Sequence, residues 1–152
     1  MNFKEIVRDV LLTEAKELEK TANKISFDIE KAIDLIVNSK GKLIVTGVGK
    51  SGLVGAKIAA TLASTGTSSF FLHPTEAMHG DLGMIGKDDI VLGISYSGES
   101  EELIQILPHL KRLNIPLIAM AKSENSTLAK YADVFINIAV DKEACPLDTA
   151  PT

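Results

Sequence analysis

The chain has 152 residues, of which 45% are hydrophobic and 24% are charged, and this composition predicts one globular domain with a full core. The net charge is −4, aromatic residues make up 5%, and there is no lysine- or arginine-rich run, so nucleic acid and membranes are not expected partners. The single cysteine, Cys145, excludes an internal disulfide, and we expect a cytoplasmic protein.

Two helices are predicted before the first strand. Residues 3–21 are predicted to form a helix. Apolar residues recur at every third or fourth position from Val7 to Ile25, which gives this helix one apolar stripe. Such a stripe suits a helix at a subunit interface, and it suits equally a helix that covers its own sheet. Ser26 is placed to cap a second helix, which Gly41 ends. The inner face of that helix is predicted to consist of Ile29, Ala32, Ile33 and Ile36.

Short apolar strands alternate with helices in the rest of the chain. The five predicted strands are residues 42–46, 68–72, 89–95, 116–121 and 134–138. The helices predicted between them are residues 51–65, about 100–113 and 126–131. This alternation predicts an α/β fold, a three-layer sandwich with helices on both faces of a parallel sheet. Right-handed crossovers favour the flavodoxin-like order 2-1-3-4-5, in which the first and third strands are neighbours.

The loop after the first strand, VTGVGKSG, is similar to two nucleotide-binding motifs. A P-loop needs a further glycine at position 44, and the chain has Ile44 there. A dinucleotide site fits Gly47, Gly49 and Gly52, but it also needs an acid at the end of the second strand, where the chain has His73. Both nucleotide sites are therefore disfavoured.

The loop after the third strand, SYSGES, offers the hydroxyls of Ser95, Ser97 and Ser100 just before a helix. Helix N-termini present free N–H groups and partial positive charge, so they bind phosphate. Ser51 stands at the start of the helix that follows the neighbouring strand. The four serines are therefore expected to face one crevice and to hold a phosphate monoester, although serines and glycines are equally typical of caps and turns. The loop glycines that let the backbone approach the phosphate are Gly47, Gly49 and Gly98.

Four segments together resemble one enzyme family. GVGKSG, SYSGES, HPTEAMHGDLGMI and KEACPLDTAPT are similar to the sugar isomerase (SIS) domain of arabinose-5-phosphate isomerases over essentially the whole chain. The resemblance implies interconversion of ribulose 5-phosphate and arabinose 5-phosphate, which feeds 3-deoxy-octulosonate synthesis for lipopolysaccharide or capsule. It also implies a five-stranded sandwich with an N-terminal helical arm, assembled as a homotetramer.

The resemblance further implies that residues 1–152 form one SIS domain of a longer enzyme. Family members commonly continue into an HPGG-type segment, whose histidine is often assigned a catalytic role, and into a pair of regulatory cystathionine-β-synthase-type modules. Two other functions stay open from the residues. One is a sensor that binds a sugar phosphate without turnover, and the other is a hexulose-phosphate isomerase. Lys50 and MHGDLG favour an enzyme, because a sensor needs only the serines.

The resemblance assigns phosphate binding to the four serines and points to further polar groups around the sugar, namely Lys50, His79, Glu102 and Glu143. Aldose–ketose exchange needs a base and a donor that stabilises an enediolate oxygen. Lys50 suits the donor, and the other three are candidates to transfer protons. An acid at Glu102 would also favour the helix dipole without any catalytic role. We expect no cofactor and no metal site, apart from adventitious metal binding at His79.

Overall fold

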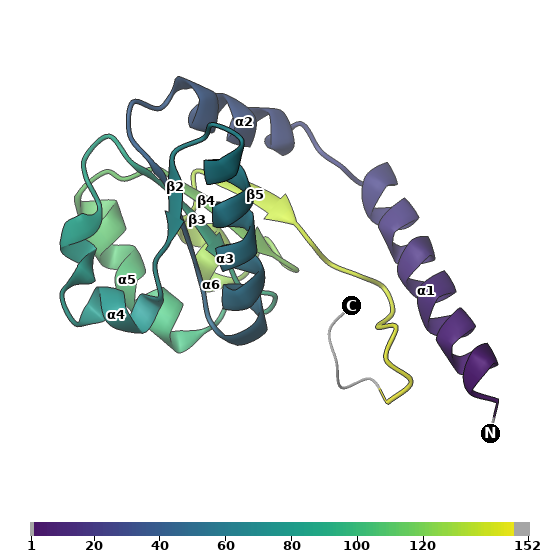
Figure 1. Cartoon of the computed structure of the whole chain (residues 1–152). Helices are drawn as coiled ribbons and strands as arrows, with labels where there is room; N and C mark the ends of the chain where they lie inside the picture. Colours follow the sequence, from purple (N-terminus) through teal and green to yellow (C-terminus); the bar gives the residue numbers. More distant parts are fainter. Residues whose placement is uncertain (1, 148–152) are drawn as a thin grey trace.

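The computed structural model describes residues 2–147, in which a five-stranded parallel sheet lies between two layers of helices (Figure 1). The strand order is β2-β1-β3-β4-β5, as predicted, and every neighbouring pair is parallel. The elements are α1 (Phe3–Asn23), α2 (Asp28–Asn38), β1 (Leu43–Gly47), α3 (Gly49–Ser64), β2 (Ser69–Phe71), α4 (Pro74–Met78), the 3-10 helix η1 (Asp81–Met84), β3 (Ile90–Ile94), α5 (Glu101–Arg112), β4 (Leu117–Ala121), α6 (Thr127–Tyr131) and β5 (Val134–Asn137).

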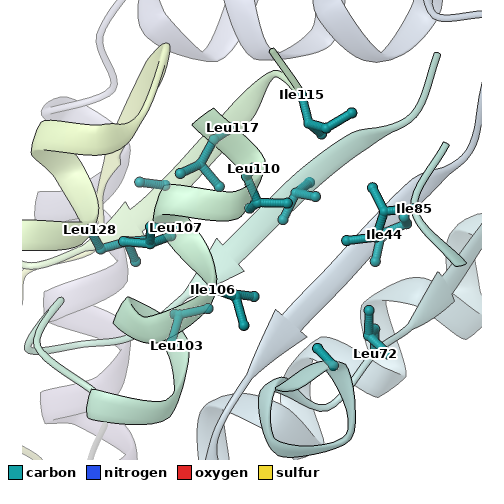
Figure 2. Packing of buried hydrophobic residues seen from close by; sticks show 13 residues of the cluster. Ile44, Leu72, Ile85, Leu103, Ile106, Leu107, Leu110, Ile115, Leu117 and Leu128 are labelled. Carbon is teal, nitrogen blue, oxygen red and sulfur yellow. The ribbon is translucent and has the colours of Figure 1, made fainter. Parts of the chain in front are cut away.

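The three central strands β1, β3 and β4 are buried on both faces, the edge strands β2 and β5 are partly buried, and alternate side chains supply two separate cores. Ile44 of β1 points into the core under α4, α5 and α6, whereas Val45 points into the core under α2 and α3. Figure 2 shows the first core, to which α5 contributes residues at the spacing of one helix face, Leu103, Ile106, Leu107 and Leu110. This double burial explains why the central strands are mostly apolar in the sequence.

Helix α1 does not cover the sheet. It stands away from the sandwich, with the segment that follows β5 running beside it (Figure 1). Leu11 is 59% exposed and Leu18 is 71% exposed, so the alternative in which this stripe packs on the protein's own sheet is wrong. Within residues 2–147, no helix combines the length and hydrophobicity needed to cross a membrane.

Helix α2 differs from the prediction at both ends and on its inner face. It ends at Asn38 with Ser39 as its C-cap, before the predicted end at Gly41. Its N-cap residue is Phe27, although Ser26 Oγ does accept a hydrogen bond from Asp28 N at 3.3 Å. The predicted inner face is confirmed at Ala32, which is buried, but Ile33 is 52% exposed. The prediction is also confirmed at Ile36, which packs against the second core together with Leu35, because α2 lies near β5, whereas Ile29 is 36% exposed.

Candidate functional site

The first loop passes directly from β1 into α3. Helix α3 begins at Gly49, two residues earlier than predicted, so Lys50 and Ser51 lie in its first turn. Gly49 has a φ of +60°, in the left-handed region that favours glycine. The N-cap residue, Val48, provides no side-chain hydrogen bond to the helix. The N–H groups of this first turn are therefore left for an external acceptor such as an anion.

Gly47 lets this turn approach the end of β3. A Cβ atom at Gly47 would lie 2.8 Å from the carbonyl oxygen of Ile94 and 3.2 Å from the carbonyl carbon of Ser51. Gly47 also pairs with Ile94 in the sheet register. The first turn of α3 and the end of β3, from which the second loop starts, are thus brought together at one edge of the sheet.

The second loop holds its serines in a local network. Ser95 is 2% exposed, and its Oγ lies 2.9 Å from Ser100 Oγ and accepts a hydrogen bond from Gly98 N at 3.1 Å. Ser100 occupies the N-cap position of α5 but makes no side-chain cap. Ser100, which the sequence allows as a helix cap or as a further phosphate donor, therefore does not act as a side-chain cap but contacts Ser95. The exposed Ser97 Oγ accepts from Glu99 N at 3.1 Å.

The start of α6 braces this loop. Gly98 has a φ of +70°, and a Cβ atom there would overlap Oγ and Cβ of Ser126. Leu128 N donates to the carbonyl oxygen of Gly98 at 3.1 Å. Thr127 N donates to Glu99 Oε1 at 2.7 Å, and this hydrogen bond lowers the pKa of the Glu99 carboxyl. Sequence reasoning missed Ser126 and Thr127, because their only local signal is that of an ordinary helix start.

The four candidate sugar-contacting residues come from four different segments. Lys50 and Glu102 are both exposed. They lie in the first turns of α3 and α5, at the same helix starts as Ser51 and Ser100. His79 is exposed at the C-cap of α4, followed by Gly80 with a φ of +132°. Glu143 is half-buried in the segment after β5. Lys50 and Glu102 are therefore placed with the two loops, whereas His79 and Glu143 lie on segments outside them.

A cavity of about 730 Å³ adjoins the second loop. Its walls are one face of α1, the side chains of Tyr96 and Lys122, and residues 140–146. It is lined by Glu143 but by none of the four serines. Tyr96 connects the two regions, because it stands between Ser95 and Ser97 in the second loop and also lines the cavity.

The remaining histidines and the cysteine lie outside the two loops. His73 Nδ1 accepts from Thr75 N at 3.2 Å as the N-cap of α4. His109 Nδ1 lies 2.9 Å from an Arg112 nitrogen, and Cys145 is half-buried. Across residues 2–147, no three histidine, cysteine, aspartate or glutamate side chains are grouped so as to hold a metal ion.

Comparison with known proteins gives consistent matches. The profile of the SIS domain family matches residues 35–152. The chain is 56% identical over 129 residues to arabinose 5-phosphate isomerase KdsD of Pseudomonas aeruginosa, covering 85% of this chain and 40% of that protein. It is 49% identical over 152 residues to KdsD of Yersinia pestis, covering all of this chain and 46% of that protein. The chain thus spans less than half the length of these curated relatives.

Among solved structures, protein c3406 of E. coli CFT073, in complex with arabinose 5-phosphate, has a TM-score of 0.95 and 41% sequence identity. That match covers the whole of this chain and 82% of the other. A protein of Methanococcus jannaschii, for which a 3-hexulose-6-phosphate isomerase function was inferred, matches with a TM-score of 0.65 and 26% identity, covering 91% of this chain and 72% of the other.

Proposed function

The chain belongs to the SIS domain family, and on this premise we propose that it catalyses aldose–ketose isomerisation of a pentose 5-phosphate. The substrate pair is arabinose 5-phosphate and ribulose 5-phosphate. The observation that carries this proposal is the pair of open helix N-termini at the switch point between β1 and β3, with Ser95 and Ser100 in contact at 2.9 Å. Such a concave set of hydroxyl and N–H donors suits a compact phosphate monoester.

The phosphate is bound by the hydroxyls of Ser51, Ser95, Ser97 and Ser100 together with the free N–H groups of α3 and α5. Ser95 and Ser100 hydroxyls are already oriented by each other, which lowers the ordering cost of binding. Lys50, one residue before Ser51, adds a positive charge at the same helix start. The overall charge of −4 does not oppose this, because the attraction is local.

The chemical step moves one proton from C2 of the open-chain aldose to C1, through an enediolate. A second proton moves from the C2 hydroxyl to the C1 oxygen, so that aldehyde and alcohol become alcohol and ketone. Lys50 stabilises the negative charge of the enediolate oxygen, in the manner of a preorganised donor. Glu102, Glu143 or His79 acts as the general acid–base group. The reaction moves protons without net oxidation, and it requires no redox cofactor.

Relatives named KdsD support the finer assignment that the product feeds 3-deoxy-octulosonate synthesis for lipopolysaccharide or capsule. The exposed apolar stripe of α1 supports assembly with further copies of the chain as a homotetramer. The single cysteine supports a cytoplasmic setting. The length of the relatives supports residues 1–152 being one SIS domain of a longer enzyme.

Isomerisation is tested by incubating the chain, and a version extended beyond Thr152, with arabinose 5-phosphate in deuterated water. We expect ribulose 5-phosphate with deuterium at C1, and little turnover of a 3-hexulose 6-phosphate. A Ser95→Ala variant should bind the sugar phosphate about 10-fold or more weakly, since it loses a donor to a charged group. The exposed Ser64→Ala substitution is its control. Tight binding without deuterium uptake in either version would favour the sensor function instead.

A further inference from the structure

We propose that Glu17 is a positioning residue, which together with Tyr96 fixes the backbone of residues 140 and 141 and so places Glu143 for the reaction. This inference rests on the proposed function, because it assumes that Glu143 acts on the sugar. Glu17 and Asp141 lie 124 positions apart in the chain, and they meet because α1 runs beside the segment that follows β5 (Figure 1).

The burial of Glu17 is unusual for its helix. It is the buried residue of α1, 3% exposed, whereas the apolar stripe of the same helix faces outward. Burying a carboxylate is unfavourable unless both oxygens are paired. Glu17 Oε2 accepts a hydrogen bond from Asp141 N at 2.7 Å, and Oε1 accepts one from Lys20 Nζ at 2.6 Å. The buried contact of α1 with the rest of the chain is therefore made by the charged carboxylate of Glu17.

Alternating charges extend the contact. The Asp141 carboxylate lies 3.0 Å from Lys20 Nζ and 3.2 Å from Lys24 Nζ. The hydrogen bond from Lys20 lowers the pKa of the Glu17 carboxyl, and those from Lys20 and Lys24 lower the pKa of the Asp141 carboxyl. Both carboxylates are therefore ionised at neutral pH. Glu17 holds the backbone N–H of Asp141 in the segment after β5, and Asp141 pairs with Lys20 of α1 and with Lys24 just after it. The exposed pairs contribute little energy singly, but the buried Glu17 bond sets the geometry.

Tyr96 supplies the second anchor. Val140 N donates to Tyr96 Oη at 3.4 Å, one residue before the Glu17 contact. The ring of Tyr96 lies 5.4 Å from Lys122 Nζ in a cation–π arrangement. The last sheet-like bond of the segment is Ile138 N to the Ala121 carbonyl, at 3.1 Å. Beyond it, the hydrogen bond of Val140 N ties the backbone to the second loop, and that of Asp141 N ties it to α1.

The anchored segment carries Glu143, which lines the 730 Å³ cavity together with residues of α1 and Tyr96. Acid–base catalysis depends on placement to within about 1 Å, and a misplacement of that size costs roughly 100-fold in rate. Phosphate binding depends on other elements, the first turns of α3 and α5. Loss of the Glu17 anchor is therefore expected to lower kcat while leaving sugar-phosphate affinity unchanged.

The test compares the wild-type chain with Glu17→Leu, Glu17→Gln and the control Glu19→Leu. Glu19 is an exposed acid on the same helix. Three quantities are measured: kcat for arabinose 5-phosphate, its Kd by calorimetry, and amide hydrogen exchange of residues 139–145. Glu17→Leu should lower kcat about 10-fold or more with an unchanged Kd, and it should speed exchange of residues 139–145. Glu17→Gln should retain most of kcat, because its amide oxygen still accepts from Asp141 N, and Glu19→Leu should behave as wild type.

Unchanged exchange in Glu17→Leu would overturn the anchoring role. Faster exchange with wild-type kcat would overturn the link to catalysis, and a parallel loss of affinity and melting temperature would show that Glu17 only supports the fold. A wild-type chain that binds the sugar phosphate without turning it over would instead refute the isomerase function. In that event the proposed placement of Glu143 for catalysis is refuted as well. The exchange data alone then decide whether Glu17 holds residues 140 and 141 in place.

Discussion

Gly98 is the position where one methyl group should most disturb the candidate phosphate site. Its φ of +70° disfavours any residue with a Cβ, and that Cβ would overlap Oγ and Cβ of Ser126 at the start of α6. Gly98 N donates to Ser95 Oγ, and the Gly98 carbonyl accepts from Leu128 N. A shift of the backbone at Gly98→Ala is therefore passed directly to Ser95 and to α6.

Two effects set the size of the loss. The left-handed conformation costs an alanine about 1–2 kcal/mol. Overpacking against Ser126 costs about 1–3 kcal/mol, because the overlapped atoms belong to a side chain held at a helix N-cap. We expect Gly98→Ala to lower the free energy of unfolding by about 2–5 kcal/mol and to weaken sugar-phosphate binding.

Alanine variants at two other glycines separate the conformational cost from the packing cost. Gly49 has a φ of +60°, but a Cβ atom there would have no neighbour within 4 Å, so Gly49→Ala should show the conformational cost alone, about 1–2 kcal/mol. Gly83 has neither a positive φ nor a close neighbour, and Gly83→Ala should change stability by less than about 0.5 kcal/mol. Urea unfolding of the three variants measures the series. If Gly98→Ala were no less stable than Gly83→Ala, the steric account of this loop would be refuted.

Lys50→Gln should lower kcat by about 100-fold through loss of enediolate stabilisation, whereas Lys57→Gln on the same helix should not, as steady-state kinetics would reveal. Burial raises the pKa of Asp89, but hydrogen bonds from the backbone N–H groups of Lys42 and Gly86 outweigh it, so the folded-state pKa is lowered. Its stabilising effect should be complete above the unfolded pKa of about 3.9 and be lost as pH falls through the lower folded value. Asp89→Asn should cost about 1–3 kcal/mol at pH 7 and flatten this acid dependence in urea titrations, unlike the exposed Asp88→Asn. Leu18→Lys, which adds charge to the 71% exposed apolar stripe of α1, should shift the chain toward its monomer mass of 16.3 kDa in sedimentation equilibrium, and an unshifted assembly would argue against α1 as the interface.

The order of the elements and the strand order were accessible from the sequence, because they depend on local patterns. Runs such as 43–45 and 117–121 are apolar at every position, as expected for strands buried on both faces. The handedness of βαβ crossovers then leaves few orders, and the observed order is the predicted one. The pairing of the VTGVGKSG and SYSGES loops at one sheet edge follows from that order alone.

Other features were decided by the tertiary structure. The periodicity of α1 shows that one face is apolar, but not what lies against it, and both uses of the stripe have the same pattern. From the sequence the side chain of Ser100 could cap α5, and only the folded loop shows that it lies 2.9 Å from Ser95 Oγ and makes no cap. The contact of Glu17 with Asp141 joins residues 124 positions apart, and only the path of the chain after β5 brings them together.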